Sequence, residues 1–425
     1  MKRIIFSMIF ICGITNISAQ DINVDSVINY AKAQLKPEKS KSDYKTAADL
    51  LEKVVQIQPK NAEAYYLLGY SYEAINASCP DYDRTIICST TLALALKASA
   101  AIEKSIELEP KYTGEIIYLD PYTKLSSIWG WYAFLQYYKG NIDSAKWALL
   151  EGKKRGGFSN YSLSYYRKVL EKCSNNAILF TYGDLSFFSI LYLQLVNNIR
   201  TDVTHIELSQ ITATWYIQFL QSKKKVPFSI SPKQCQELSK NGYRKWKPEQ
   251  LTIKSSRGKF TWKPTTEFEN YLLWQEEIML DLIKTNKFKK DIFFTAGVEP
   301  SYYLGLDDFF ISNFISDRVN YDNQDDLTIN QMIELIEFIY NDIYQFNSAV
   351  TDDFICIVLN RMNILSEVYK YIKQNKLEDA YLLYDRLTLL DDIEKNPYPV
   401  QYSNQEKFHR KISDMITESR QEDKR

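Results

Sequence analysis

Apolar residues recur with the spacing of amphipathic helices at both ends of the chain. In the stretch YKTAADLLEKVVQIQP, the residues Ala47, Leu51 and Val54 fall on one helical face, and Pro59 ends the pattern. The same spacing returns in four further stretches, over residues 62–73, 94–110, 126–154 and 371–384. We therefore expect paired helices in the first third of the chain and again near its C-terminus.

The middle of the chain follows a different period. Residues 177–181 form a short apolar run, residues 202–208 alternate, and residues 291–295 are mostly apolar, which predicts three strands. A buried helix is expected over 187–196, and Thr212 is placed to cap the helix after the second strand. This strand, helix, strand, helix order predicts a parallel sheet with a right-handed crossover.

Two smaller elements are expected between the second and third strands. The runs LTIK and KFTW flank the turn at 255–258 and predict a hairpin. Thr266 and Glu269 have the spacing of a capping box, which predicts a helix start there. The apolar face of that helix would hold Phe268, Tyr271, Leu272, Ile278 and Leu282. A further helix is predicted from Leu306 onward.

The helix pairs resemble tetratricopeptide repeats, which have a period of about 34 residues. Such a repeat needs a large aromatic residue early in its first helix and small residues where its second helix crosses. The positions that carry the resemblance are Tyr65, Leu68, Gly69, Tyr72 and Ala98 in one pair, Trp129, Gly140 and Ala145 in the next, and Ala380 near the C-terminus. The resemblance implies stacked helices that bind a protein or peptide partner.

Together these patterns predict an α-rich α+β protein. Tetratricopeptide-like helical hairpins stand at both ends, and a Rossmann-like α/β unit lies in the centre. The expected organisation is a signal peptide over 1–19, helical repeats over 20–155, an α/β domain over 175–325, repeat-like helices over 326–402 and a charged tail over 403–425.

The first twenty residues have the pattern of a secretory signal peptide. Lys2 and Arg3 precede the apolar run 4–14, and the small pair Ser18 and Ala19 follows it. That run is shorter than the roughly 20 residues that a membrane-spanning helix needs, and no later stretch is that long without charges. We expect an exported protein, periplasmic or associated with the envelope of a bacterium, without a membrane span once the signal is removed.

The overall charge is close to neutral. The chain has 52 Lys and Arg against 53 Asp and Glu, a formal net charge of -1. A basic balance is the electrostatic footprint of nucleic-acid binding, and the balance here lacks it. Neither a nucleic-acid partner nor binding to anionic lipid is therefore expected.

Five cysteines follow the predicted leader: Cys79, Cys88, Cys173, Cys235 and Cys356. Cys79 and Cys88 flank a short loop, and in an oxidising compartment they are placed to form a disulfide. The other interpretation is two independent small residues. No CxxC pair occurs in the sequence, so a zinc or redox site is not expected.

A second resemblance covers residues 176–402. It is carried by Thr181, Gly183 and Asp184, by the runs 192–194, 200–203 and 215–217, and later by YLGLDDF over 303–309 and by Pro397 and Tyr398. These motifs resemble the extracytoplasmic portion of bacterial membrane proteins with a protein O-mannosyltransferase-like core. The resemblance implies a shared extracytoplasmic fold, whereas the membrane-embedded region that it associates with transferase chemistry has no counterpart in this sequence.

Polar residues after the first strand form the main candidate site. Thr181, Gly183, Asp184 and Ser186 stand where a parallel strand meets a helix N-terminus, a place that often binds ligands. The other interpretation is a tight turn at Gly183, with Asp184 or Ser186 capping the helix.

Residues after the third strand extend this candidate. Tyr302 is placed to stack on a sugar, and Asp307 and Asp308 would join Asp184 in a carboxylate cluster for a cation or sugar hydroxyls. Otherwise the tyrosines pack in the core, and the two aspartates lie in the first turn of a helix and interact with its dipole. The only two histidines, His205 and His409, have no neighbouring nucleophile and are expected to be structural.

No catalytic, cofactor or metal motif is recognisable in the sequence. The sequence therefore favours an exported, noncatalytic scaffold that binds a protein or peptide in envelope protein or glycan assembly. The alternative is a glycan-binding or glycosyl-transfer accessory protein that uses the central α/β domain.

Overall fold

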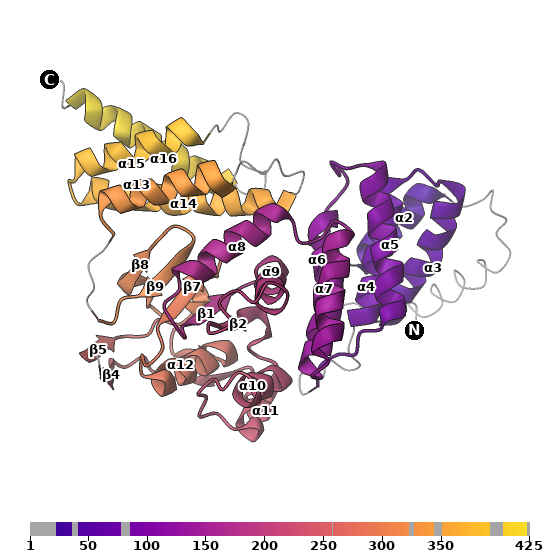
Figure 1. Cartoon of the computed structure of the whole chain (residues 1–425), viewed down its shortest axis with the longest axis horizontal. Coiled ribbons are helices and arrows are strands. Elements are labelled where there is room, and N and C mark those ends of the chain that lie inside the picture. The colour runs from indigo at the N-terminus through magenta and orange to yellow at the C-terminus, as the bar shows by residue number, and fades with distance from the viewer. Residues whose placement is uncertain are drawn as a thin grey trace, which may run out of the picture. The chain divides into compact units, whose positions relative to one another are not determined.

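The computed structural model forms two compact units, a helical unit within residues 23–157 and an α/β unit from 158 onward (Figure 1). It describes residues 23–35, 41–77, 86–256, 258–322, 327–343, 351–391 and 403–422. The predicted signal peptide, Cys79 and the Pro397–Tyr398 motif lie outside the described residues.

The first unit consists of helices that pack in chain order. Its described helices are α2 (Val24–Gln34), α3 (Lys41–Ile57), α4 (Ala62–Ala77), α5 (Leu92–Leu108), α6 (Pro121–Tyr138) and α7 (Ile142–Lys154). Each helix contacts the next, and α4 also contacts α2 and α6. The helical pattern expected for this part of the chain is present, while the assignment of the pairs as tetratricopeptide repeats stays a prediction.

Small residues set the spacing of these helices. A Cβ atom on Gly69 of α4 would lie 2.6 Å from Cγ1 of Ile102 and 2.9 Å from the carbonyl oxygen of Ala98, both on α5. No side chain fits that gap, so glycine lets the two helices approach closely. From α6, the buried Trp129 donates from Nε1 to Oγ of Ser99 at 2.9 Å, which ties the next helix to α5.

Helix α6 begins earlier than the repeat pattern indicates. The predicted third pair starts at Ser126, whereas the helix starts at Pro121 with Asp120 as its N-cap. Oδ1 of Asp120 accepts from the backbone N–H of Tyr122 at 2.9 Å, and proline is favoured at the first helical position because it has no N–H to satisfy. Local capping therefore moves the start of the helix by five residues.

The second unit is built on a five-stranded mixed sheet with the order β2-β1-β7-β9-β8. The strands are β1 (Ile178–Thr181), β2 (Thr204–Glu207), β7 (Ile292–Thr295), β8 (Phe310–Ser312) and β9 (Ser316–Val319). Strand β1 pairs in parallel with β2 and β7, and β9 pairs antiparallel with β7 and β8. The three predicted strands and the parallel pairing are confirmed, whereas a Rossmann-like unit is not established by this mixed sheet.

Every residue of β1, β2 and β7 is buried, so both faces of this part of the sheet are covered. The alternation of residue types in the second strand therefore does not correspond to an alternation of exposed and buried side chains. The helices in sequence around these strands are α8 (Asn160–Lys172), α9 (Asp184–Leu195), α10 (Thr214–Ser222), α11 (Pro232–Asn241) and α12 (Trp274–Asn286).

The prediction of a helix from Leu306 onward is wrong. After the short 3-10 turns η4 (Pro300–Tyr302) and η5 (Asp307–Phe309), the chain enters β8. Phe310 pairs with Val319 of β9, and its ring lies 5.4 Å from the ring of Phe294 in β7. Because strand pairing and aromatic packing act on Phe310 together, the segment adds an antiparallel hairpin to the sheet instead of a helix.

Two predicted helix starts are also wrong. Thr212 does not cap α10, whose N-cap is Ala213. The predicted capping box of Thr266 and Glu269 does not start α12, because residues 271–273 form strand β6 (Tyr271–Leu273), which pairs with β3 (Tyr243–Lys245). The helix begins at Trp274, where the Glu276 side chain accepts from the Leu273 N–H at 2.6 Å.

The predicted hairpin is confirmed. Strands β4 (Leu251–Ser255) and β5 (Gly258–Trp262) pair antiparallel, and Ile253 lies opposite Phe260 on the buried face. The connection includes the turn at Ser255 and Gly258, as the sequence indicates.

Helices follow the sheet to the end of the described chain. They are α13 (Ile329–Phe338), the π-helix η6 (Ile339–Ile343), α14 (Thr351–Lys373), α15 (Leu377–Leu390) and α16 (Ser403–Glu422). The expected charged tail contains α16, which contacts α14 and α15 and buries His409, Ile412 and Ile416. These three residues have helical spacing, so the charged side chains between them form only the outer face.

Candidate functional site at the carboxyl ends of the parallel strands

Strands β1, β2 and β7 end at the same edge of the sheet because they run in parallel. Thr181 ends β1, Glu207 ends β2 and Thr295 ends β7. The chain leaves β1 toward β2 and later returns to place β7 on the other side of β1. In open α/β sheets such an edge is the usual position of a ligand site.

Glu207 holds this edge together. It is 1% exposed, and its carboxylate accepts from Oγ1 of Thr181 at 2.8 Å, from the Gly183 N–H at 2.8 Å and from the Ser209 N–H at 3.2 Å. Burial raises the pKa of Glu207 to about 7, although these hydrogen bonds act in the opposite direction. Sequence patterns did not point to Glu207, since a glutamate at a strand end belongs to no recognisable motif.

The turn into α9 is stabilised in a way that the sequence analysis did not foresee. Gly183 is itself the N-cap, with φ of 96°, and no side chain caps the helix. Asp184 lies in the first turn, while Oγ of Ser186 donates to the carbonyl oxygens of Tyr182 at 3.2 Å and Gly183 at 2.9 Å. Neither Asp184 nor Ser186 is therefore the cap, and Glu207 instead satisfies the Gly183 N–H.

Tyr302 also reaches this edge. Its ring centroid lies 5.6 Å from that of Tyr182, which follows β1, and both residues are partly exposed. Burial raises the pKa of both hydroxyls, and Glu299 contributes to each shift. Thr181, Gly183 and Tyr302 thus belong to one region of the fold, as the sequence analysis expected.

The two aspartates after the third strand do not complete a metal site. Asp307 and Asp308 lie in the three-residue turn η5 and are exposed. Within the part of the chain that the structure describes, no group of three His, Cys, Asp or Glu side chains is placed to hold a metal ion. The alternative interpretation as first-turn residues of a helix also fails, because η5 is too short to have the dipole of an α-helix.

The motif over 200–203 has a structural role. The Arg200 guanidinium donates to the carbonyl oxygens of Leu170 at 2.7 Å, Cys173 at 2.7 Å and Ser174 at 2.9 Å, which closes the C-terminus of α8. Asp202 pairs with Arg200 at 2.9 Å, and this pairing holds the pKa of Asp202 below its usual range. These contacts give Arg200 and Asp202 a structural role in this chain.

Both histidines are buried in packed surroundings. His205 lies in β2 with its ring 5.1 Å from the ring of Phe187, and burial lowers its pKa to about 3. His409 lies in α16 with its ring 6.4 Å from that of Tyr384, and burial lowers its pKa to about 4. Burial and low pKa values fit the structural roles that the sequence analysis assigned to them.

The residues that resemble repeat positions are mostly core residues. Trp129, Ala98, Ala145 and Ala380 are fully buried, Leu68 and Gly69 are buried, Tyr65 and Tyr72 are half-buried, and Gly140 adopts φ of 87° in the exposed turn before α7. Their positions account for helix packing.

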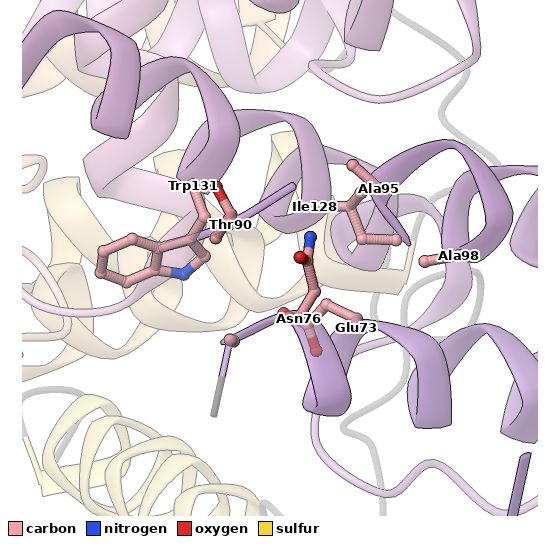
Figure 2. Close-up of a pocket in the computed structure, with 8 residues that line it drawn as sticks. Glu73, Asn76, Thr90, Ala95, Ala98, Ile128 and Trp131 are labelled. Atoms are coloured by element: carbon pink, nitrogen blue, oxygen red, sulfur yellow. The ribbon is translucent and has the colours of Figure 1, made fainter. Parts of the chain in front are cut away.

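A pocket between α4, α5 and α6 is lined by Glu73, Asn76, Thr90, Ala95 and Trp131 among others (Figure 2). It has room for about one water molecule. The Asn76 side chain already accepts from the Thr91 N–H at 2.7 Å, and Glu73 pairs with Lys124 at 3.0 Å. Oγ1 of Thr90 is buried there without a hydrogen-bond partner among the described residues. The pocket is therefore a small packing defect, too small for a substrate.

The cysteines fall into two classes. Cys88 is disulfide-bonded, and its predicted partner Cys79 lies outside the described residues. Cys173 and Cys235 are free thiols and are buried, which raises their pKa values to about 12 and about 11. Such thiols are protonated at neutral pH, so they are poor nucleophiles and metal ligands.

Comparison with known proteins identifies one related segment. Residues 162–268 match the family described as TMEM260-associated domain 2. The match runs from α8 through the β4–β5 hairpin, so it includes Glu207 and the Arg200 motif, and it covers less than half of the chain. No curated protein and no solved structure matches the chain.

The matched stretch lies largely within the region whose motifs resemble the extracytoplasmic portion of O-mannosyltransferase-like membrane proteins. The relation to TMEM260 is therefore supported for this segment. Among the described helices, none combines the length and the apolar character that crossing a membrane requires.

Proposed function

We propose that the chain is an exported, noncatalytic binding protein that captures a protein partner through the outer face of α7. The observation that carries this proposal is the pair Trp147 and Leu150, which lie one helical turn apart on α7 and are 45% and 50% exposed. Helix α7 is the last helix of the first unit. In a stack of helix pairs, a terminal helix needs a polar outer face unless another element covers it.

The position of Trp147 supports an anchoring role. Its ring packs edge-on against the ring of Trp129 at 5.9 Å, and Trp129 is fully buried. A supported aromatic side chain loses little conformational freedom when a partner covers it, and tryptophan is frequent among the residues that dominate interface energies. The partner best suited to this surface is a helix or peptide that presents apolar side chains.

A second surface, on α4, is already covered by the chain. The Tyr66 hydroxyl donates to the carbonyl oxygen of Leu119 at 2.8 Å and accepts from the Ile117 N–H at 3.1 Å. Nζ of Lys124 lies 3.7 Å from the centroid of the Tyr70 ring. The link between α5 and α6 thus covers Tyr66, and Lys124 of α6 covers Tyr70. The outer face of α7 is therefore the better candidate for a partner.

The test compares capture by the full chain and by the variant W147S/L150S. Each protein is cross-linked to its interaction partners in envelope fractions and then purified. The amount of captured partner should be at least about tenfold lower for the variant, because two apolar anchors are removed. The first unit should remain folded at the temperature of the assay, since both side chains are about half exposed, and its unfolding transition is the check. The mature N-terminus of the same sample tests export, with cleavage after Ala19 as the expected result.

The matched control is L382S/L389S, which removes two leucines on α15 that are 51% and 71% exposed. This control should capture the partner as well as the unchanged protein does. Equal capture by W147S/L150S would overturn the proposed role of α7, and equal loss in both variants would indicate a nonspecific hydrophobic effect.

A glycan-handling function is the second candidate, favoured by the partly exposed ring pair Tyr182 and Tyr302 beside the buried Glu207. Partly exposed aromatic faces are suited to stacking on sugar rings. Glycan binding that is lost in Y302A while the fold is retained would support this candidate, and the absence of any glycan binding by the full chain would exclude it.

A further inference from the structure

The near-neutral charge of the whole chain conceals a strongly basic segment. Residues 223–263 contain twelve Lys and Arg and two Glu, a formal charge of +10, while the chain as a whole has a net charge of -1. The net charge of the whole chain, from which no binding to anionic lipid was expected, does not reveal this asymmetry. Charge that is concentrated in one segment acts on a partner regardless of the balance elsewhere.

The basic segment is exposed in the fold. It includes α11, β3 and the β4–β5 hairpin, and ten of its described cations, including Lys233, Lys245 and Lys263, are exposed. Of these ten side chains, only that of Arg244 forms a salt bridge with a described residue, to Glu277. In the view of Figure 1, α11 and the hairpin lie on the side of the second unit away from α13–α16.

The hairpin places like charges directly opposite each other. Lys254 pairs with Lys259 across β4 and β5, on the face opposite to the buried pair Ile253 and Phe260. Like charges at a cross-strand position destabilise a hairpin. A destabilising pair on an exposed face favours an anionic partner that neutralises both lysines.

Exposed aromatic residues accompany the lysines. Tyr243 of β3 is 55% exposed, and its ring packs edge-on against that of Tyr271 on β6 at 5.4 Å, where Tyr271 lies opposite Lys245. Phe268, just before β6, is 54% exposed. The Phe268 side chain has no hydrogen-bonding group that water could satisfy. Its exposure therefore favours a partner that offers an apolar layer as well as negative charge.

We infer that the segment 223–263, together with Phe268 and Tyr271, is a peripheral binding surface for membranes that contain anionic lipids. Lysine predominates over arginine, which fits a diffuse layer of negative headgroups better than the bidentate recognition of individual phosphates in a nucleic acid. The lysines lie against the headgroups, and Tyr243, Phe268 and Tyr271 enter the interfacial region.

The experiment measures sedimentation of the purified full chain with vesicles. Vesicles of phosphatidylcholine with about 30% phosphatidylglycerol should bind the protein at low salt, whereas pure phosphatidylcholine should not. The variant K254E/K259E should lose at least about tenfold in affinity for the anionic vesicles, and F268S should weaken binding at a salt concentration that screens the charges.

The matched control is K53E/K60E, which makes the same change of charge at exposed lysines of the first unit. Binding by this control within about twofold of the unchanged protein supports a localised surface, provided that circular dichroism shows all variants folded. Three results would overturn the inference: no binding to anionic vesicles, equal loss in both double variants, or tighter binding to a single-stranded oligonucleotide or to polyglutamate than to the vesicles. An unchanged affinity in F268S would overturn the part assigned to the aromatic residues.

Discussion

Glu207 shows how a single buried residue organises the edge of the sheet. Its carboxylate joins the end of β1, the N-terminus of α9 and the turn η3 (Leu208–Gln210) by accepting from Thr181, Gly183 and Ser209. The Thr181 hydroxyl is buried and the Gly183 N–H is partly buried, and leaving such a donor unsatisfied costs about 1–3 kcal/mol. The same burial raises the free energy of the charged carboxylate.

The pKa of Glu207 leads to a prediction about pH. The folded-state pKa of about 7 exceeds the ordinary value of 4.5, so between these values the folded state binds a proton that the unfolded state has released. The free energy of unfolding should therefore decrease as pH rises from about 4.5 to about 7, with a contribution from Glu207 of at most about 3 kcal/mol. Urea unfolding at pH 5 and pH 8 measures this decrease in the free energy of unfolding.

The variant E207Q should lose this component of the pH dependence, since glutamine does not titrate. E249Q, at an exposed position, provides the control and should keep the dependence of the unchanged protein. An identical pH dependence in E207Q and the unchanged protein would mean that Glu207 does not titrate in this range.

At the scale of elements, the ends of helices and strands depend on contacts from distant parts of the sequence. Arg200 lies 26 to 30 residues after the carbonyl groups that it satisfies at the end of α8. Leu306 and the residues after it have a helix-like start, yet pairing with β9 makes them a turn and a strand. The local pattern gives the type of most elements, while their exact limits follow from tertiary contacts.

The Arg200 contacts predict the effect of R200K. Lysine keeps the charge but lacks the planar set of donors that reaches three carbonyl groups, so the free energy of unfolding should decrease by about 1–3 kcal/mol. Hydrogen exchange should accelerate in the last turn of α8 and in β1. R167K, at an exposed position on α8, is the control and should change neither quantity; equal exchange rates in R200K and the unchanged protein would contradict the assigned role.

At the scale of the whole molecule, each unit has its own buried core. The first is formed by helix contacts around Trp129, and the second includes the strand residue Phe180, whose ring lies 5.0 Å from that of Phe294. Units with separate cores can unfold in separate transitions, so a single unfolding temperature would not describe such a chain.

This organisation predicts two calorimetric transitions that respond to different mutations. W129A should destabilise the first unit by about 3–5 kcal/mol because it leaves a large cavity, and F180A should have a similar effect on the second unit. Each variant serves as the control for the other. A single transition that moves equally in both variants would show that the two units unfold together.

The amino-acid sequence by itself determined that both terminal regions of the chain are helical, and it determined the three buried strands and the β4–β5 hairpin. These features depend on hydrophobic period and local turn residues. The sequence also indicated that Thr181, Gly183 and Tyr302 belong to one region, since parallel strands end at a common edge. The helix expected after Leu306 was wrong, and Asp307 and Asp308 lie in the short turn η5, because the course of the chain after β7 depends on its pairing with β9.

Only the tertiary structure decided which side chains are buried, bound or available. Glu207 became an acceptor for three donors through the pairing of β1 and β2, and Trp129 became a core residue while Trp147 stayed exposed on the next helix. The exposed lysines of 223–263 are visible as a charge run in the sequence, but their cross-strand pairing follows from the fold. The physical reason is that period and propensity are local properties, whereas burial, hydrogen-bond partners and surface charge depend on residues that are distant in sequence.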